Sequence, residues 1–326
     1  MTIEIYIALA LIGFALTFYL MLDGYDVGLG IMLPFQGNIQ DQRVLVSIVQ
    51  SSWDGNESWI ILIGTMLWGA FPGVYSTVLP DHYIYLYIML FGFFLRAVSM
   101  EFQGTKRQFA QYWRYLFFLS SWMIVLPQGL IFASIICSFL NPAVVNHVIM
   151  NTCIVLLLVL MYGINGMNWQ YMKSVGRVKK KAVLFSRWLI VSFLLIFSIS
   201  LWMLLQKNAI LISFSKERAI ALIAVAVLIY MVLIFMYSYY SFKKVQQHVA
   251  TFYAALMIDL LLVIGLGLFM FPYISPEVLI ENTASPSPSS IRFLVIGVGL
   301  CMPMVLWYNL FAYRVFKGKQ KYVNKH

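Results

Sequence analysis

The sequence predicts an all-α membrane protein with about nine transmembrane helices. The 326 residues are 62% hydrophobic and only 10% charged, and the mean hydropathy is +0.86. A soluble domain is about half apolar and about a quarter charged. The apolar residues come in long blocks of roughly 20, the length that a helix needs to cross a bilayer. Strands of a membrane barrel would instead be about 10 residues long, with alternating polarity.

The blocks predict a single integral membrane domain over residues 1–326. No stretch between them is long enough for a soluble domain, and the longest connections are residues 28–56 and 272–290. Residues 272–290 are rich in Pro and Ser, so we expect a turn-rich cap there. The expected spans cover residues 5–27, 57–72, 82–100, 115–139, 147–170, 183–206, 218–241, 250–271 and 291–313.

The basic residues predict how the chain is oriented in the membrane. Seventeen of the 22 Lys and Arg lie after the odd-numbered spans or in the C-terminal tail, and four lie on the other side. Cytoplasmic loops carry such an excess. We therefore expect the N-terminus outside, the C-terminus in the cytoplasm, residues 28–56 as a cytoplasmic loop and residues 272–290 as an outer loop. The net charge of +10 then encodes orientation, and nucleic-acid binding is not expected.

Cysteine and histidine offer little for a metal or cofactor site. The three cysteines lie in or beside apolar blocks without a CxxC pattern, which predicts small buried residues. Haem would need His or Met ligands that face inward. A dihaem cytochrome b that uses His82 and His147 is the alternative; otherwise no metal and no cofactor is expected in this chain.

Ionisable side chains gather where the first three spans meet the cytoplasm. Such groups are costly at membrane depth, so each is a candidate functional residue. Tight connections would make the three spans neighbours. The acids and the base are Asp23 and Asp26 at the end of span one, Asp54 and Glu57 at the start of span two, and Arg96 and Glu101 at the end of span three.

Each of these groups also has a structural interpretation. Asp54 and Glu57 have the spacing of a helix capping box, and they could equally form the cytoplasmic mouth of a proton path. Asp23 opens a glycine-containing stretch that is typical of a helix exit and turn. Arg96 either snorkels to the surface or forms a buried pair with Asp23, Asp26, Asp54 or Glu101.

Asp259 lies near the middle of the eighth expected span and must face the protein interior. Proton relay and structural hydrogen bonding explain it equally well. A proton-coupled secondary transporter is a second functional hypothesis. It predicts inverted repeats and helices broken near the midplane, and only the Gly-rich residues 24–30 could be such a break.

Two motifs carry a family resemblance. They are Asp23-Gly24-Tyr25-Asp26 with Gly28 and Gly30, and Trp53-Asp54-Gly55-Asn56-Glu57 with Trp59. Residues 70–75, the stretch from Arg96 to Phe102, and residues 271–276, 281–285 and 303–314 agree with it. Together they resemble subunit II of the cytochrome bd ubiquinol oxidases over essentially the full length.

The resemblance implies a subunit of a bacterial inner-membrane complex that oxidises quinol and reduces oxygen to water. Two haems b and one haem d would belong to the partner, subunit I, and this chain would bind none. The complex would be electrogenic without pumping protons, and the isolated chain would not be catalytic. A small single-span subunit and a quinone held as a structural lipid are further elements that the family allows.

The resemblance also implies roles for individual residues. Asp54 would admit protons from the cytoplasm, Glu101 would lie on the same path, and Arg96 would be the arginine of the third span. Family members often have a basic residue two positions after the acid that corresponds to Glu101. This chain has Gln103 at that position. This departure weakens the case that a downstream base keeps Glu101 ionised. Asp23, Asp26, Glu57 and Asp259 are the supporting candidates.

Overall fold

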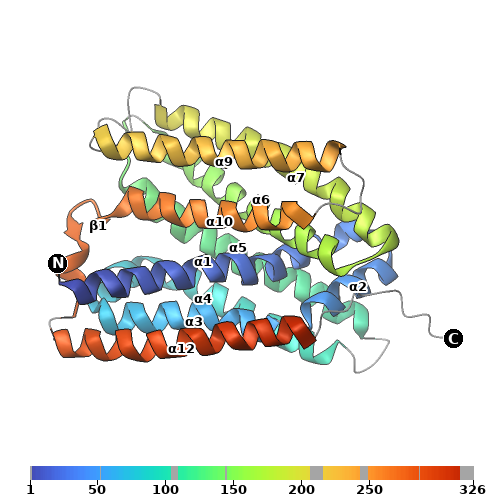
Figure 1. Ribbon diagram of the computed structural model, residues 1–326, viewed down its shortest axis with the longest axis horizontal. Coiled ribbons are helices and arrows are strands. Elements are labelled where there is room, and N and C mark those ends of the chain that lie inside the picture. Colours follow the sequence, from blue (N-terminus) through green and yellow to red (C-terminus); the bar gives the residue numbers. More distant parts are fainter. Residues whose placement is uncertain are drawn as a thin grey trace.

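The computed structural model describes residues 2–51, 53–103, 109–143, 145–205, 216–242, 249–285 and 287–315. Nine long helices within these ranges lie side by side along one axis (Figure 1). They are α1 (Ile3–Ile31), α3 (Trp53–Ala70), α4 (Pro72–Phe102), α5 (Ala110–Ser138), α6 (His147–Lys173), α7 (Gly176–Leu205), α9 (Lys216–Phe242), α10 (Val249–Met270) and α12 (Pro288–Val315).

The predicted all-α membrane fold is confirmed. Eight of the described helices are long and apolar enough to cross a bilayer. The remaining long helix is α3, which has 18 residues and starts with the polar stretch from Asp54 to Glu57. The second predicted span is therefore a helix of the bundle with a polar first turn, and this turn contributes to the candidate site.

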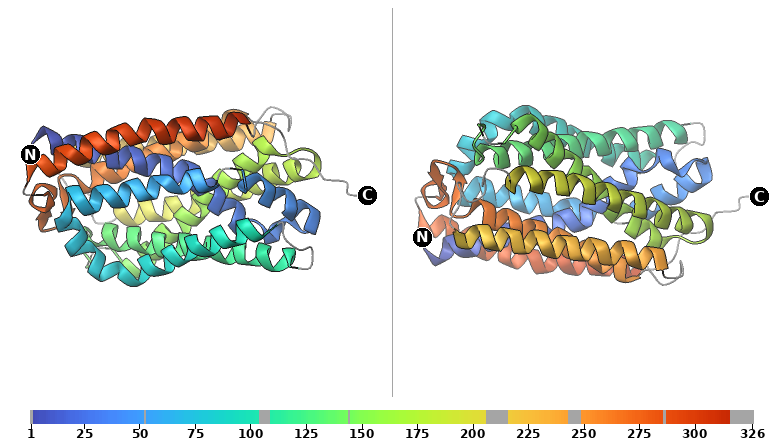
Figure 2. Two further views of the ribbon diagram at one scale, coloured as in Figure 1. Left: turned by 90° about the horizontal axis from the view of Figure 1, so that it is seen from below. Right: turned by 90° about the horizontal axis from the view of Figure 1, so that it is seen from above.

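Helix α1 lies at the centre of the bundle, where it packs against α3, α5, α6, α10 and α12. α5 and α12 lie on opposite sides of the molecule (Figure 2). α9 packs on α7 and α10, at the edge far from α12 (Figure 1). Polar side chains on α1 therefore face other helices, and Asp23 and Asp26 are fully buried.

The glycines of α1 serve close helix packing. A Cβ atom on Gly28 would lie 1.7 Å from the carbonyl oxygen of Tyr162 in α6, and one on Gly166 would lie 2.6 Å from the Gly28 backbone. Small residues allow such an approach between membrane helices. The helix exit expected after residue 27 is wrong, because α1 continues through these glycines to Ile31.

The predicted loop at residues 28–56 is largely helical. It holds the end of α1, the 3-10 turn η1 (Pro34–Gln36) and the amphipathic helix α2 (Ile39–Val49), whose N-cap Asn38 accepts a hydrogen bond from the Asp41 amide. The apolar face of α2 joins a core with the end of α1 and covers one end of the bundle (Figure 1). We call this the α2 end.

The opposite end, which we call the β1 end, is formed by the Pro/Ser-rich residues 272–290. They contain the hairpin β1 (Tyr273–Ser275) and β2 (Val278–Leu279), the short helix α11 (Ile280–Thr283) and the start of α12. The Ser285 amide donates to the carbonyl of Ala70, at the break between α3 and α4. Residues 73–81, which were expected to connect two spans, are helical because Pro72 starts α4 as its N1 residue.

Candidate functional site

Arg96 is the centre of a buried ion-pair cluster. Its Nη2 donates to Asp23 Oδ1 at 2.5 Å and to Glu57 Oε1 at 2.6 Å, and its Nε donates to the same Glu57 oxygen at 2.9 Å. The Arg96 side chain is fully buried. Of the two arrangements expected for Arg96, the structure has the buried pair. Sequence reasoning named Asp23 as a possible partner and missed Glu57.

Asp26 lies beside this cluster and is held by neutral groups. The Nδ2 atom of Asn56 donates to Asp26 Oδ2 at 2.8 Å and lies 2.7 Å from the Tyr25 hydroxyl. Within the described part of the chain no salt bridge reaches Asp26. Asn56 is therefore a site residue, although the sequence offered it only as a member of the Trp53–Glu57 motif.

The cluster contains more acids than bases. The carboxyl groups of Asp23 and Glu57 share the single guanidinium of Arg96, and the Asp26 carboxyl beside them has no salt bridge in the described structure. Buried charges are costly unless they are paired. A carboxyl group without a cation of its own is therefore more stable when it carries a proton, and that proton is exchangeable. Within the described residues, three buried polar atoms at this site lack a hydrogen-bond partner of standard geometry: Asp23 Oδ2, Asp26 Oδ1 and Arg96 Nη1.

The cluster opens to the surface on the side of Glu57. The Glu57 side chain is 20% exposed, whereas those of Asp23 and Arg96 are 0% exposed. Asp54, in the same first turn of α3, is exposed and accepts a hydrogen bond from the Tyr308 hydroxyl at 3.1 Å. The order of exposure therefore runs from Asp54 through Glu57 to the buried Asp23.

Of the two interpretations of Asp54 and Glu57, the capping box is not the one seen in the described structure. α3 begins at Trp53, so Asp54 lies inside the first turn and accepts from the adjacent Gly55 amide. Glu57 points inward to Arg96 because the buried guanidinium needs a second carboxylate. Glu57 thus forms an ion pair inside the bundle instead of capping its own helix.

Glu101 stays apart from this cluster. It lies in the last turn of α4 and is exposed, whereas Arg96, five residues earlier, points into the bundle. Within the described ranges, which omit residues 104–108, we find no hydrogen bond or ion pair of the Glu101 side chain. Its role on a proton path remains a prediction.

A second buried ion pair fastens α2 to α7. The fully buried Asp41 carboxylate lies 2.7 Å from Lys181 Nζ and 3.9 Å from Arg177 Nε. Lys181 also donates to the carbonyl of Gln36, and Gln50, just after α2, donates to the Met100 carbonyl of α4. α2 is thereby tied to two neighbouring helices, and its apolar side chains Val44–Val49 cover the α2 end.

Asp259 is buried between α10 and α6. Its Oδ2 accepts a hydrogen bond from Asn165 Nδ2 at 2.9 Å, so it faces the protein interior as expected. It lies outside the Arg96 cluster, and Asn165 was not named from the sequence. The available sequence signal for Asn165 was its position as an amide side chain within an apolar block.

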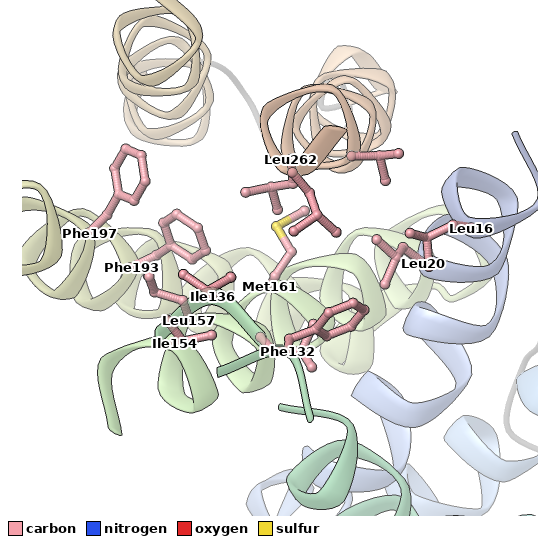
Figure 3. A pocket seen from close by; sticks show the side chains of 13 residues that line it. Leu16, Leu20, Phe132, Ile136, Ile154, Leu157, Met161, Phe193, Phe197 and Leu262 are labelled. Atoms are coloured by element: carbon pink, nitrogen blue, oxygen red, sulfur yellow. The ribbon is translucent and has the colours of Figure 1, made fainter. Parts of the chain in front are cut away.

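An apolar cavity of about 180 Å³ lies beside these groups, between α1, α5, α6, α7 and α10. Its lining side chains converge from five helices and bear no nitrogen or oxygen (Figure 3). Leu20, Met161 and Leu262 form part of its wall. The cavity can hold an apolar chain but offers no side-chain hydrogen bond to a polar headgroup.

The described histidines do not favour a shared haem. His82 Nδ1 lies 2.8 Å from the Val78 carbonyl, and His147 Nε2 lies 3.0 Å from the Leu140 carbonyl. Their helices α4 and α6 both pack on α5, which lies between them. No group of three or more His, Cys, Asp or Glu suited to a metal occurs among the described residues.

Comparison with known proteins identifies the family. Residues 4–316 match the family "Cytochrome bd terminal oxidase subunit II". The chain is 29% identical to the Escherichia coli K12 cytochrome bd-I ubiquinol oxidase subunit 2 over 133 residues, which are 40% of this chain and 34% of that protein. It is 30% identical to the Bacillus subtilis cytochrome bd ubiquinol oxidase subunit 2 over 120 residues, 36% of each. The matched segments thus span about a third of these relatives.

The fold agrees with this assignment. A chain of the bd oxidase structure from Geobacillus thermodenitrificans superposes with a TM-score of 0.76 at 13% identity, over 97% of this chain and 99% of that chain. The apolar helices and the family together indicate a multi-pass protein of the cytoplasmic membrane. The chain belongs to the cytochrome bd terminal oxidase subunit II family.

Proposed function

We propose that this chain is subunit II of a quinol:oxygen oxidoreductase complex, where it conducts protons from the cytoplasm toward the site of oxygen reduction. Family membership supports the oxidase over the proton-coupled transporter. The partner is a haem-bearing subunit I, which carries two haems b and haem d, with or without a small single-span subunit. This chain stabilises the complex and is not catalytic on its own.

The α2 end faces the cytoplasm in this proposal. Most of the basic residues lie next in sequence to helix ends on that side, which favours this orientation. α1 starts at the β1 end and α12 ends at the α2 end (Figure 1), in keeping with an N-terminus outside. Protons consumed in water formation would come from the cytoplasm and quinol protons would be released outside, so turnover is electrogenic without pumping.

The proton path begins at Asp54 and continues through Glu57 to the Arg96 cluster. Asp54 is exposed and takes a proton from bulk water. Glu57 is partly exposed and hydrogen-bonded to Arg96, so it connects the surface with Asp23. The observation that carries the proposal is this excess of acids around one buried arginine, with its polar opening at Glu57. Glu101 is a separate acid that we propose as a second uptake point on the same side.

The apolar cavity supports a structural role for a quinone. The side chains of its wall are all apolar and suit the isoprenoid tail of a quinone held as a lipid, with the headgroup outside. Such a molecule would stabilise the helix bundle and would not be the substrate.

Asp54→Asn tests the proton path. The amide keeps the size of the side chain but cannot carry the proton, so we expect quinol-driven oxygen consumption by the purified complex to fall roughly 10²-fold. The matched control is Glu277→Gln, a neutralised exposed acid at the β1 end, which should keep full activity. Full activity of Asp54→Asn, with haem content unchanged, would show that Asp54 is not the uptake group.

A further inference from the structure

A second line of polar groups runs from Asp23 to Asp259. Tyr19 and Asp23 lie one turn apart on α1, and Tyr162 and Asn165 lie one turn apart on α6. Helical spacing of three or four residues places each pair on one face. Asp259 completes the line from α10.

Close packing brings these faces together. A Cβ atom on Gly24 of α1 would lie 2.9 Å from the Tyr162 ring and 3.3 Å from Asn165 Nδ2. The Asn165 amide lies 3.4 Å from the Leu20 carbonyl and hydrogen-bonds Asp259. The Tyr162 hydroxyl donates a hydrogen bond to Gln128 Oε1 of α5 at 2.9 Å. Asn165 therefore connects Asp259 with α1, and the Tyr162 ring packs beside it against Gly24.

In the part of the chain that the structure describes, four oxygen atoms along this line have no hydrogen-bond partner of standard geometry. They are Tyr19 OH, Asp23 Oδ2, Asn165 Oδ1 and Asp259 Oδ1, and their residues are at least nine-tenths buried. Buried polar atoms in native proteins are almost always satisfied, by protein groups or by ordered water. Hydroxyls, carboxyls and water are also the groups through which protons move along a chain.

Asp259 differs from Asp23 in its charge environment. Asp23 has Arg96 at 2.5 Å, whereas no salt bridge reaches Asp259 in the described part of the chain. Among the described residues, it accepts a hydrogen bond only from the neutral amide of Asn165. An unpaired carboxylate in an apolar interior is costly, so Asp259 is best accommodated as a neutral acid.

We propose that Asp259 stores a proton and exchanges it with Asp23 across bound water and the hydroxyl of Tyr19. When the complex draws a proton from Asp23, the Asp259 carboxyl releases one proton. Each hydroxyl or water between them accepts one proton and passes on another, and the Asp23 carboxylate is reprotonated. One proton moves from Asp259 to Asp23, which leaves a carboxylate hydrogen-bonded by Asn165. This branch rests on the proposed proton path and adds a reservoir to it.

Redox-induced infrared difference spectroscopy of the purified complex tests the proposal. We expect a C=O band of a protonated carboxylic acid that changes on reduction and shifts in D₂O. Asp259→Asn should abolish the band, and Asp259→Glu should move it without removing it. Asn165→Leu should shift its frequency, because it deletes the hydrogen bond to the carboxyl.

Two controls separate this proposal from the proposed function. Asp41→Asn changes a buried acid that is already paired with Lys181, and it should leave the band intact. Asp54→Asn should retain the band, because the stored proton is on Asp259 whichever acid admits it. A spectrum of Asp259→Asn that superposes on that of the unsubstituted complex would overturn the reservoir. Full activity of Asp54→Asn would overturn only the uptake path. If the Asp259→Asn complex does not accumulate, the band position in Asp259→Glu is the deciding measurement. A moved band supports the reservoir, and an unmoved band overturns it.

Discussion

Two buried ion pairs lie toward the α2 end of this protein, and they are built differently. Asp41 has a lysine at 2.7 Å and an arginine at 3.9 Å, so one acid faces two cations. The Arg96 cluster has two acids on one cation with the Asp26 carboxyl beside them, and three polar atoms there have no hydrogen-bond partner of standard geometry among the described residues. The first site is electrostatically satisfied, whereas the second is not.

The difference teaches how a buried charge in the membrane can be assigned a role. A buried acid that is fully paired with cations holds two helices together, and an exchangeable proton would not stabilise it further. A surplus of acids beside a partly exposed glutamate has groups that can take up and release protons. Burial alone does not separate the two sites, since Asp41 and Asp23 are both fully buried.

Arg96→Leu should have the largest effect of any single change at these sites. It leaves Asp23 and Glu57 without their cation, and breaking a buried pair costs about 3–5 kcal/mol. We expect the complex to lose most of its thermal stability or to fail to accumulate in the membrane. Arg96→Lys keeps the charge without the fork of donors and should be intermediate. An Arg96→Leu complex with an unchanged melting temperature would mean that the cluster is not an ion-pair network.

Glu57→Gln should reduce activity more than it reduces stability. The amide oxygen can still accept from Arg96, but the side chain can no longer carry a proton. We expect oxygen consumption to fall about tenfold or more, with thermal unfolding of the complex shifted only slightly. Equal losses in both measurements would make Glu57 a structural partner of Arg96 and place the path elsewhere.

Asp41→Asn should have the smallest effect on activity and thereby completes the comparison. The substitution weakens the attachment of α2 to α7, so we expect faster hydrogen exchange in residues 39–49. Oxygen consumption per haem should stay within about twofold of the unsubstituted complex, because a matched pair has no proton to pass on. A large loss of activity at unchanged stability would show that the α2 end also conducts protons.

The sequence by itself determined the fold class and the candidate acids. Apolar blocks of membrane length can satisfy their backbone only as helices, so the spans followed from composition and length. Asp23, Asp54 and Asp259 stood out because ionisable residues beside or within such blocks are costly and need a reason.

Only the tertiary structure decided which of these groups meet. The close contact of Gly28 with α6 kept α1 helical past Asp26, where local turn chemistry had predicted an exit. Glu57 turned toward Arg96, where its spacing from Asp54 had predicted a cap. Local signals describe one segment and its own backbone. The pairing of Asp23, Glu57 and Arg96 depends on three helices, and it follows from the high cost of leaving a buried guanidinium unpaired.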